Sequence, residues 1–238
     1  MTPRLSVVIP AYNEEQRLPG SLAKVLRYLD QRGQGFEVLV VDDGSSDRTA
    51  ELARAYEAQG VRVILCGENR GKGAALRRGV AESRGELVLL TDADLSTPIE
   101  DLERLETMLA EAPIVIGSRA LASSQIELRQ PWYRERMGKV FNWLLLRLGL
   151  THLPDTQCGF KLLQGDLARR LFPLLTIDGF AYDVEMLWQA RRLGAPVASA
   201  GVRWADSPSS RVHPLFDSGR MLFDVLRLRL SSGARRER

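Results

Sequence analysis

The chain has 238 residues, of which 45% are hydrophobic and 26% are charged, a composition typical of a globular protein with a full core. No apolar run reaches the length of a membrane-spanning helix, and Met1 leads directly into a strand pattern, so we expect neither a transmembrane helix nor a signal peptide. Aromatic residues make up 7% of the chain and no nucleic-acid-binding motif is present, which excludes nucleic acid as the expected partner.

Short apolar runs alternate with helical patterns through the first 120 residues. Strands are expected at 5–9, 36–41, 61–65, 87–90 and 114–116, and helices at 14–31, 47–59, 72–83 and 98–110. The run at 36–41 is continuously apolar, which favours a parallel sheet that is covered on both faces. This alternation predicts an α/β fold with a Rossmann-like, doubly wound, mostly parallel sheet and right-handed crossovers.

Beyond residue 120 the alternation stops. In chain order we expect a loop at 123–131, a helix at 132–148, a polar turn at 155–161, helices at 165–175 and 182–193, a strand near 197–202, a loop at 205–214 and an amphipathic helix at 215–230. The tail at 231–238 has the composition of a disordered segment.

The segment from Glu86 to Pro98 combines a buried strand with two carboxylates at its carboxyl end. Ligands of open α/β sheets bind just beyond the carboxyl ends of the strands. Asp92 and Asp94 repel each other there unless a positive charge lies between them. A Mg²⁺ or Mn²⁺ ion that carries a diphosphate would supply it, because these ions prefer oxygen ligands. An acidic turn that caps the next helix is the alternative interpretation.

The first strand-to-helix turn contains Pro10, Tyr12, Asn13 and Glu14. It lacks the glycine-rich sequence of dinucleotide-binding folds, which disfavours NAD or FAD. The ring face of Tyr12 and the carboxylate of Glu14 suit a base and a ribose. Asn13 is expected to cap the helix that follows.

The next two strands also end in polar turns. Ser46 or Asp47 can cap a helix, which leaves Asp42 and Asp43 without a structural role. A carboxylate beside a nucleotide pocket can accept the imide N–H of uracil or the N1–H of guanine, and so fix the identity of the base. Lys72 belongs to a glycine-rich turn without P-loop spacing, and it faces either a diphosphate or the solvent.

Four segments occur in the order and at the spacing typical of family 2 glycosyltransferases with the GT-A fold, which this chain resembles. They are Val7-Val-Ile-Pro-Ala-Tyr-Asn-Glu-Glu15, Val41-Asp-Asp-Gly-Ser-Ser-Asp47, Asn69-x-Gly-Lys-Gly73 and Asp92-Ala-Asp94. The second half resembles the dolichyl-/polyprenyl-phosphate glycosyltransferases, in Gly117-Ser-Arg119, Arg134-x-x-x-Gly138, Asp155-Thr-Gln-Cys-Gly-Phe-Lys161 and Phe180-Ala-Tyr-Asp-Val-Glu185. The segments around Asp94 and Asp155 are closer to the glucosyl branch than to the mannosyl branch.

The resemblance implies a GT-A catalytic domain over residues 1–210 that binds a nucleotide-sugar donor together with Mg²⁺ or Mn²⁺. By the same resemblance, Asp94 and Ser96 hold the metal. The residues expected to bind the donor are Pro10, Tyr12, Glu14, Asp42, Asp43, Lys72, Asp92, Ala93 and Lys161.

The implied acceptor is a lipid phosphate, which is anionic near neutral pH and is its own nucleophile. No strong general base is then required, and inverting attack on the anomeric carbon gives a β-linked product. Because two anions must approach each other, we expect Arg119 and Arg134 to hold the acceptor phosphate, unless they form ordinary surface ion pairs. Asp155 is expected to orient a sugar hydroxyl or to act as a base for a neutral acceptor.

Two segments have the pattern of membrane-interfacial helices. Residues 134–148 and 215–230 are each apolar on one side with arginines nearby, so they either pack on the core or lie among anionic lipid headgroups. Residues 203–238 hold eight arginines against four acidic residues, while the net charge of the whole chain is +3. We therefore assign 211–238 to an amphipathic helix and basic tail at an anionic membrane surface.

We expect a cytoplasmic protein that is peripheral at the cytosolic face of a membrane. Cys66 and Cys158 lie far apart without metal-ligand spacing and are expected to be reduced thiols, as in a cytosolic protein. The predicted function is metal-dependent, inverting transfer of a hexose, with glucose favoured, from a UDP-sugar to a polyprenyl or dolichyl-type phosphate. The alternatives are a GDP-mannose-dependent enzyme, a soluble acceptor, and a non-catalytic nucleotide-sugar-binding protein.

Overall fold

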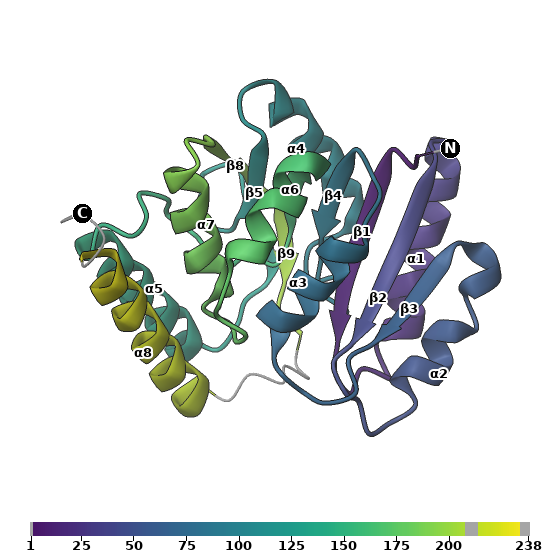
Figure 1. Cartoon of the computed structure of the whole chain (residues 1–238), viewed down its shortest axis with the longest axis horizontal. Helices are drawn as coiled ribbons and strands as arrows, with labels where there is room; N and C mark the ends of the chain where they lie inside the picture. The colour runs from purple at the N-terminus through teal and green to yellow at the C-terminus, as the bar shows by residue number, and fades with distance from the viewer. Residues whose placement is uncertain (1, 208–213, 234–238) are drawn as a thin grey trace.

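The computed structural model describes residues 2–207 and 214–233, with side chains described for 2–207 and 219–230. Within these residues a seven-stranded sheet has the order β3-β2-β1-β4-β7-β5-β8 (Figure 1), and its strands are parallel except β7. These strands are β1 (Leu5–Ala11), β2 (Phe36–Asp42), β3 (Val61–Leu65), β4 (Leu87–Leu90), β5 (Ile114–Ser118), β7 (Lys161–Gln164) and β8 (Val197–Gly201). A second, two-stranded parallel sheet pairs β6 (Gln125–Leu128) with β9 (Arg203–Ala205).

Helices cover both faces of the seven-stranded sheet. The α-helices are α1 (Leu18–Arg32), α2 (Thr49–Arg54), α3 (Lys72–Glu82), α4 (Leu102–Thr107), α5 (Trp132–Arg147), α6 (Gly165–Leu171), α7 (Tyr182–Arg192) and α8 (Pro214–Gly233). Short 3-10 helices cover Glu57–Gln59, Ile99–Asp101, Met108–Ala110 and Phe172–Leu174.

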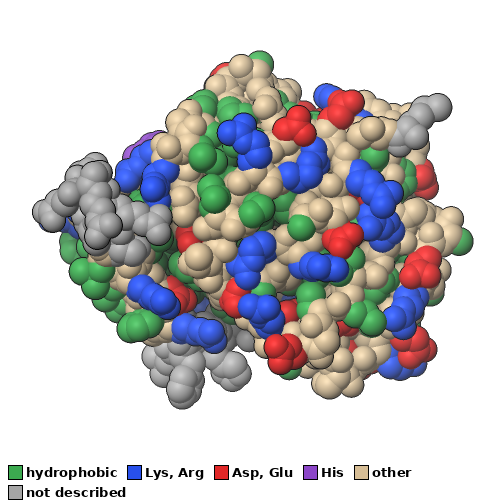
Figure 2. Space-filling view, viewed as in Figure 1, with side chains coloured by type: hydrophobic (Ala, Val, Ile, Leu, Met, Phe, Trp, Pro, Cys, Tyr) green, Lys and Arg blue, Asp and Glu red, His purple; other side chains and the backbone are tan. Residues whose placement is uncertain are grey.

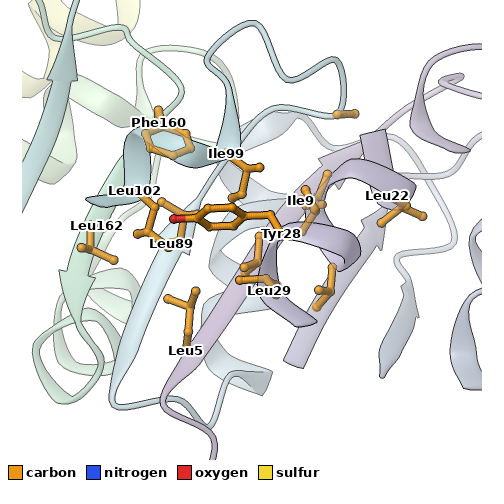
Figure 3. Close-up of a cluster of buried hydrophobic side chains, with 14 of the residues drawn as sticks. Leu5, Ile9, Leu22, Tyr28, Leu29, Leu89, Ile99, Leu102, Phe160 and Leu162 are labelled. Carbon is orange, nitrogen blue, oxygen red and sulfur yellow. The ribbon is translucent and has the colours of Figure 1, made fainter. Parts of the chain in front are cut away.

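The core has one layer on each face of the sheet because neighbouring strand residues point to opposite sides. Val7 and Ile9 of β1 pack with α1 and α4, whereas Val8 packs with α3, α6 and α7. Figure 3 shows the first layer, in which Tyr28 of α1 lies over the sheet near Leu89. The predicted α/β, doubly wound, mostly parallel architecture is confirmed.

The strand β7 was not predicted. The expected polar turn at 155–161 ends one residue earlier, and Lys161 begins a strand that runs antiparallel between β4 and β5. Its apolar part is only Leu162 and Leu163, too short to give a periodic pattern. It becomes a strand because both neighbours offer backbone hydrogen bonds. The pairing of β6 with β9 was also missed, since 123–131 was expected to be a loop.

The predicted helix at 14–31 starts late. Asn13 has a φ of +54° and α1 begins only at Leu18. The Asn13 Oδ1 atom accepts the Ser46 N–H at 2.8 Å, so the prediction that Asn13 caps this helix is wrong. The expected helices at 47–59 and 98–110 are each divided into an α-helix and one or two 3-10 turns.

The helices α5, α7 and α8 pack around a third cluster of buried side chains, which includes Leu145, Trp188 and Val225. The expected helix at 215–230 is confirmed by α8, which also includes residues 231–233 of the expected disordered tail. The predicted domain boundary at 210/211 and the rest of the tail lie outside the described residues. In the described part of the chain, no helix is both long and apolar enough to cross a bilayer.

Candidate active site

The candidate site lies where the carboxyl ends of the parallel strands share one edge of the sheet, the lower edge in Figure 1. Because β7 is antiparallel, its amino end reaches the same edge, with Lys161 opposite both Leu90 and Ile116. The loop at 155–160 is thereby placed beside the turns after β4 and β5. The second sheet joins this edge through a hydrogen bond from Ala205 N–H to the Ser96 carbonyl at 2.9 Å.

Asp94 lies in the tight turn after β4. Its Oδ1 atom accepts both the backbone N–H and the hydroxyl of Ser96, each at 3.0 Å. Its Oδ2 atom accepts a hydrogen bond from Arg17 Nη1 at 3.1 Å. Leu95 has a φ of +48°, and such left-handed backbone at a bulky residue is a strain that occurs at functional sites. The turn thus presents Asp94 and Ser96 together.

Arg17 was not predicted as a site residue. Besides Asp94, it donates to Ser207 Oγ at 2.7 Å and to both carboxylate oxygens of Glu14. The i, i+3 spacing of Glu14 and Arg17 was the available signal, but such pairs are common on protein surfaces. Glu14 therefore contributes to the site through this arginine.

Asp92 forms an ion pair with Lys72 Nζ at 2.5 Å. Burial opposes the charged form of both groups, but their mutual attraction outweighs it, so the pKa of Lys72 is raised and the pKa of Asp92 is lowered. Gly159 passes directly over this carboxylate, because a Cβ atom at that position would lie 2.0 Å from Asp92 Oδ2. The glycine in the Asp155–Lys161 segment therefore has a steric reason.

The two aspartates after β2 have different roles in the structure. Both oxygens of Asp43 accept backbone N–H groups, from Arg70 at 3.1 Å and Gly71 at 2.7 Å, so Asp43 shapes the turn that carries Lys72. Asp42 is 3% exposed, and its Oδ1 accepts the Ser45 N–H at 2.7 Å. Its Oδ2 is also buried and has no hydrogen-bond partner within the described residues, which is uncommon for a buried polar atom.

Arg119 and Asp155 form a forked ion pair. Asp155 accepts Arg119 Nε at 2.8 Å and Nη2 at 2.9 Å, and also the backbone N–H groups of Arg119 and Gln157. Burial alone would raise the pKa of Asp155, but Arg119 holds it below its ordinary value. The Arg119 guanidinium also lies over the Trp204 ring, 5.4 Å from its centroid. With four donors on its carboxylate, Asp155 orients Arg119 and is poorly placed to act as a base.

Lys161, expected to contact the donor, is 0% exposed. Its Nζ atom pairs with Asp183 at 2.6 Å and also donates to the Cys158 carbonyl. Lys161 therefore lies behind the site edge, where its charge helps to keep the pKa of Asp92 low. Asp183 could not be recognised from sequence as its partner, because it belongs to α7 and only the tertiary structure joins α7 to β7.

The remaining predicted residues lie along the same edge. Tyr12 follows β1 with its side chain 39% exposed, while Pro10 is part of β1 and Ala93 is buried between the two aspartates. Arg134 lies in the first turn of α5, partly exposed. In the part of the chain that the structure describes, its side chain has no ion pair.

Comparison with known proteins shows the family. Residues 6–172 match the model of glycosyl transferase family 2. This chain belongs to that family. The family 2 transferase is 40% identical over 251 residues to the dolichyl-phosphate beta-glucosyltransferase of Mus musculus, covering 98% of this chain and 78% of the mouse protein. It is 36% identical over 240 residues to the dolichyl-phosphate beta-glucosyltransferase of Dictyostelium discoideum, covering 94% of this chain and 73% of that protein.

The fold of this family 2 transferase matches a solved GT-A enzyme. The crystal structure of glucosyl-3-phosphoglycerate synthase from Mycobacterium tuberculosis in complex with Mn²⁺, UDP and phosphoglyceric acid superposes with a TM-score of 0.70. The match covers 95% of this chain and 78% of the synthase at 23% identity, which establishes a common fold alone. The predicted GT-A fold is confirmed.

The side-chain oxygens at the candidate site of this transferase suit a hard divalent cation. Within the described residues no cluster of three or more His, Cys, Asp or Glu side chains could enclose a metal ion. Asp94 and Ser96 offer carboxylate and hydroxyl oxygens, and Asp94 Oδ2 already faces a positive charge, that of Arg17. Mg²⁺ is often bound by one or two carboxylates together with substrate phosphates and water, so this open set of ligands fits it.

Proposed function

We propose that this chain transfers glucose from UDP-glucose to a polyprenyl or dolichyl-type phosphate, with inversion at the anomeric carbon. The observation that carries the proposal is the similarity, at 30–40% identity over nearly the whole chain, to proteins named dolichyl-phosphate beta-glucosyltransferase. The geometry supports it, because side chains suited to a nucleotide, a diphosphate and a second phosphate lie along one edge of the sheet.

The nucleotide would bind between the turns after β1 and β2. Asp42 Oδ2, which has no partner among the described residues, would turn outward to accept the imide N–H of uracil, and the exposed Tyr12 ring would stack on the base. Asp43 acts indirectly, because it holds the turn that presents Lys72 to the diphosphate. The ion pair with Asp92 keeps Lys72 charged and holds its side chain beside the proposed position of the diphosphate.

The leaving group of the proposed reaction is UDP, whose departure builds negative charge on the diphosphate. Asp94 and Ser96 would hold Mg²⁺ or Mn²⁺, which when bound neutralises this charge. Ser96 keeps the Asp94 carboxylate in one orientation through its N–H and its hydroxyl. Lys72, which is paired with Asp92, would add a second positive charge beside this turn.

The acceptor phosphate would bind at Arg119, whose guanidinium is fixed on one side by Asp155 and on its face by Trp204. Arg134, on the first turn of α5, is the second candidate for this phosphate. Since the acceptor is already ionised, the reaction needs no general base. This agrees with the geometry of Asp155, whose oxygens are occupied by Arg119 and Gln157.

A lipid acceptor requires contact with a membrane, and α5 and α8 provide the surface for it. On α5, Trp132 and Trp143 are 70% and 56% exposed, and each is followed four residues later by an arginine whose guanidinium lies over its ring. Among the described side chains of α8, the exposed apolar ones are Leu222, Phe223, Leu226 and Leu230. Figure 2 shows hydrophobic side chains bordered by Lys and Arg at the edge that α8 forms. Aromatic and aliphatic residues beside arginines suit an anionic membrane interface, here the cytosolic face.

A donor and acceptor panel tests the proposal. The purified chain is incubated with UDP-glucose or GDP-mannose, Mn²⁺ or Mg²⁺, and either a short polyprenyl phosphate or the soluble acceptor phosphoglyceric acid, with the matching polyprenol as the control acceptor. We expect a glucolipid from UDP-glucose and the polyprenyl phosphate only. Product from GDP-mannose alone would mean that mannose, and not glucose, is the transferred sugar. Turnover with a soluble acceptor only would rule out the lipid acceptor and the membrane contact. Binding of the UDP-sugar without turnover would indicate a non-catalytic protein.

A further inference from the structure

Arg17 lies between the proposed metal ligand and the turn after β1. Its guanidinium donates to Asp94 Oδ2 at 3.1 Å and to Ser207 Oγ at 2.7 Å, while two further hydrogen bonds go to Glu14. The side chains of Arg17 and Asp94 are only 19% and 17% exposed. Water therefore screens this ion pair less than a pair on the open surface.

The two carboxylate oxygens of Asp94 are not equivalent. Oδ1 is occupied by the N–H and the hydroxyl of Ser96. Oδ2 faces Arg17, its hydrogen-bond partner among the described residues. A divalent cation that approaches Oδ2 must displace or crowd the guanidinium, and the two positive charges repel each other.

We propose that Arg17 is a positioning residue that holds Asp94 while the donor is absent and thereby makes cation binding depend on the diphosphate. This inference rests on the proposed function, because it takes Asp94 as the metal ligand. Glu14, Arg17 and Asp94 together carry one net negative charge, and a divalent cation alone would reverse its sign. A nucleoside diphosphate brings enough negative charge for the cation and the guanidinium to share the site.

Glu14 makes this exchange possible. It binds the guanidinium through two N–H groups, so Arg17 keeps a partner when Asp94 turns to the cation. The guanidinium then stays beside the site and does not leave a buried charge without a partner. Arg17 can return to Asp94 when the cation and UDP depart.

The test is Mn²⁺ binding, measured by the electron paramagnetic resonance signal of free Mn²⁺, with and without saturating UDP. The original chain is expected to bind Mn²⁺ weakly alone and more tightly with UDP. Arg17→Gln is expected to bind Mn²⁺ alone about tenfold more tightly than the original chain, so the enhancement by UDP shrinks by the same factor. Arg17→Lys keeps the positive charge and is expected to bind Mn²⁺ as weakly as the original chain.

Arg4→Gln is the matched control, because Arg4 precedes β1 at the opposite edge of the sheet and pairs with the exposed Glu86. Thermal unfolding in the presence of a chelator shows that each variant is folded. Unchanged or weaker Mn²⁺ binding by Arg17→Gln without UDP would overturn the inference, as would equal binding by the original chain with and without UDP. Failure of the proposed function would appear separately, as no glucolipid in the donor panel.

Discussion

Asp94 is the residue on which the proposed chemistry depends most. Its position is fixed by Ser96 and by the left-handed backbone of Leu95. Asparagine has nearly the same shape as aspartate, so Asp94→Asn removes the negative charge with little change in shape. We expect Asp94→Asn to lower turnover at least about 100-fold, the scale of losing charge stabilisation of a leaving group. Steady-state rates of glucolipid formation measure this.

The matched control for that substitution is Asp166→Asn, since the Asp166 side chain is 98% exposed and its ion-pair partner among the described residues is Arg169 on the same helix. Its turnover should be that of the original chain. Near-normal turnover in Asp94→Asn would remove Asp94 from the reacting centre.

Gly159 is a second residue at which small changes should have large effects. A Cβ atom there would lie 2.0 Å from Asp92 Oδ2, so Gly159→Ala must push the loop away from Asp92 and its partner Lys72. We expect a loss of about 1–3 kcal/mol in unfolding free energy, as for overpacking, together with a reduced affinity for UDP. Gly20→Ala in α1 meets nothing within 4 Å, so it should leave UDP affinity unchanged, and because alanine favours a helix it should not lower the unfolding free energy. A Gly159→Ala protein with unchanged stability and UDP affinity would contradict the geometry.

Asp155 predicts a pH dependence. Arg119 holds the pKa of Asp155 in the folded protein below its ordinary value, which is that of the unfolded chain. The ionised carboxylate therefore stabilises the fold fully when the pH is above the ordinary pKa. This stabilisation is lost as the pH falls through the lower pKa of the folded protein. In urea unfolding measured from neutral pH to about pH 3, the range in which carboxylates titrate, the original chain should lose more stability than Asp155→Asn does. Parallel pH profiles would show that the ion pair does not contribute.

At the scale of elements, β7 decides the arrangement of the site. This strand runs against its neighbours and carries Lys161 into the core, where the buried charge is balanced by Asp183 of α7. The sequence between 155 and 161 resembles a surface turn, since polar residues dominate it and only two leucines follow. Its position between β4 and β5 depends on those strands being present, so local patterns could not predict it.

The pair that joins β7 to α7 can be measured. Lys161→Met leaves Asp183 buried without its partner and should lower the unfolding free energy by about 3–5 kcal/mol. The double variant Lys161→Met with Asp183→Leu should recover most of that loss, because both charges are then removed. Urea unfolding of the original chain, Lys161→Met, Asp183→Leu and the double variant gives the coupling energy between the two side chains. Purely additive losses would mean that the two side chains do not interact.

At the scale of the whole molecule, the surface of α5 and α8 lies beside the candidate site. The site loop contacts α8 directly, since Gln157 Nε2 in the loop lies 3.9 Å from Met221 Sδ of α8. A membrane that bound these helices would therefore present its lipid phosphates close to Arg119. This places the proposed acceptor and the proposed membrane surface on one side of the molecule.

Substitutions on this surface test it. Trp143 and Phe223 are 56% and 67% exposed, and burying such side chains in a membrane contributes about 1.5–3 kcal/mol each. Trp143→Gln with Phe223→Gln should lower partitioning onto vesicles with anionic phosphatidylglycerol at least about tenfold, as seen by vesicle flotation. Leu174→Gln, a change of an exposed leucine away from α5 and α8, is the control. Equal flotation of all three proteins would exclude this surface as the membrane contact.

The sequence by itself determined the alternation of strands and helices, the α/β class and the family, because these depend on local periodicity and on short segments in a fixed order. It also predicted Asp94 and Arg119 as site residues, and the structure places them in the turn after β4 and directly after β5. Only the tertiary structure decided that β7 is antiparallel, that Asp155 is occupied by Arg119, that Lys161 is buried, and that Arg17 faces Asp94. Those relations join residues far apart in the chain, and their partners are set by packing, which no local pattern records.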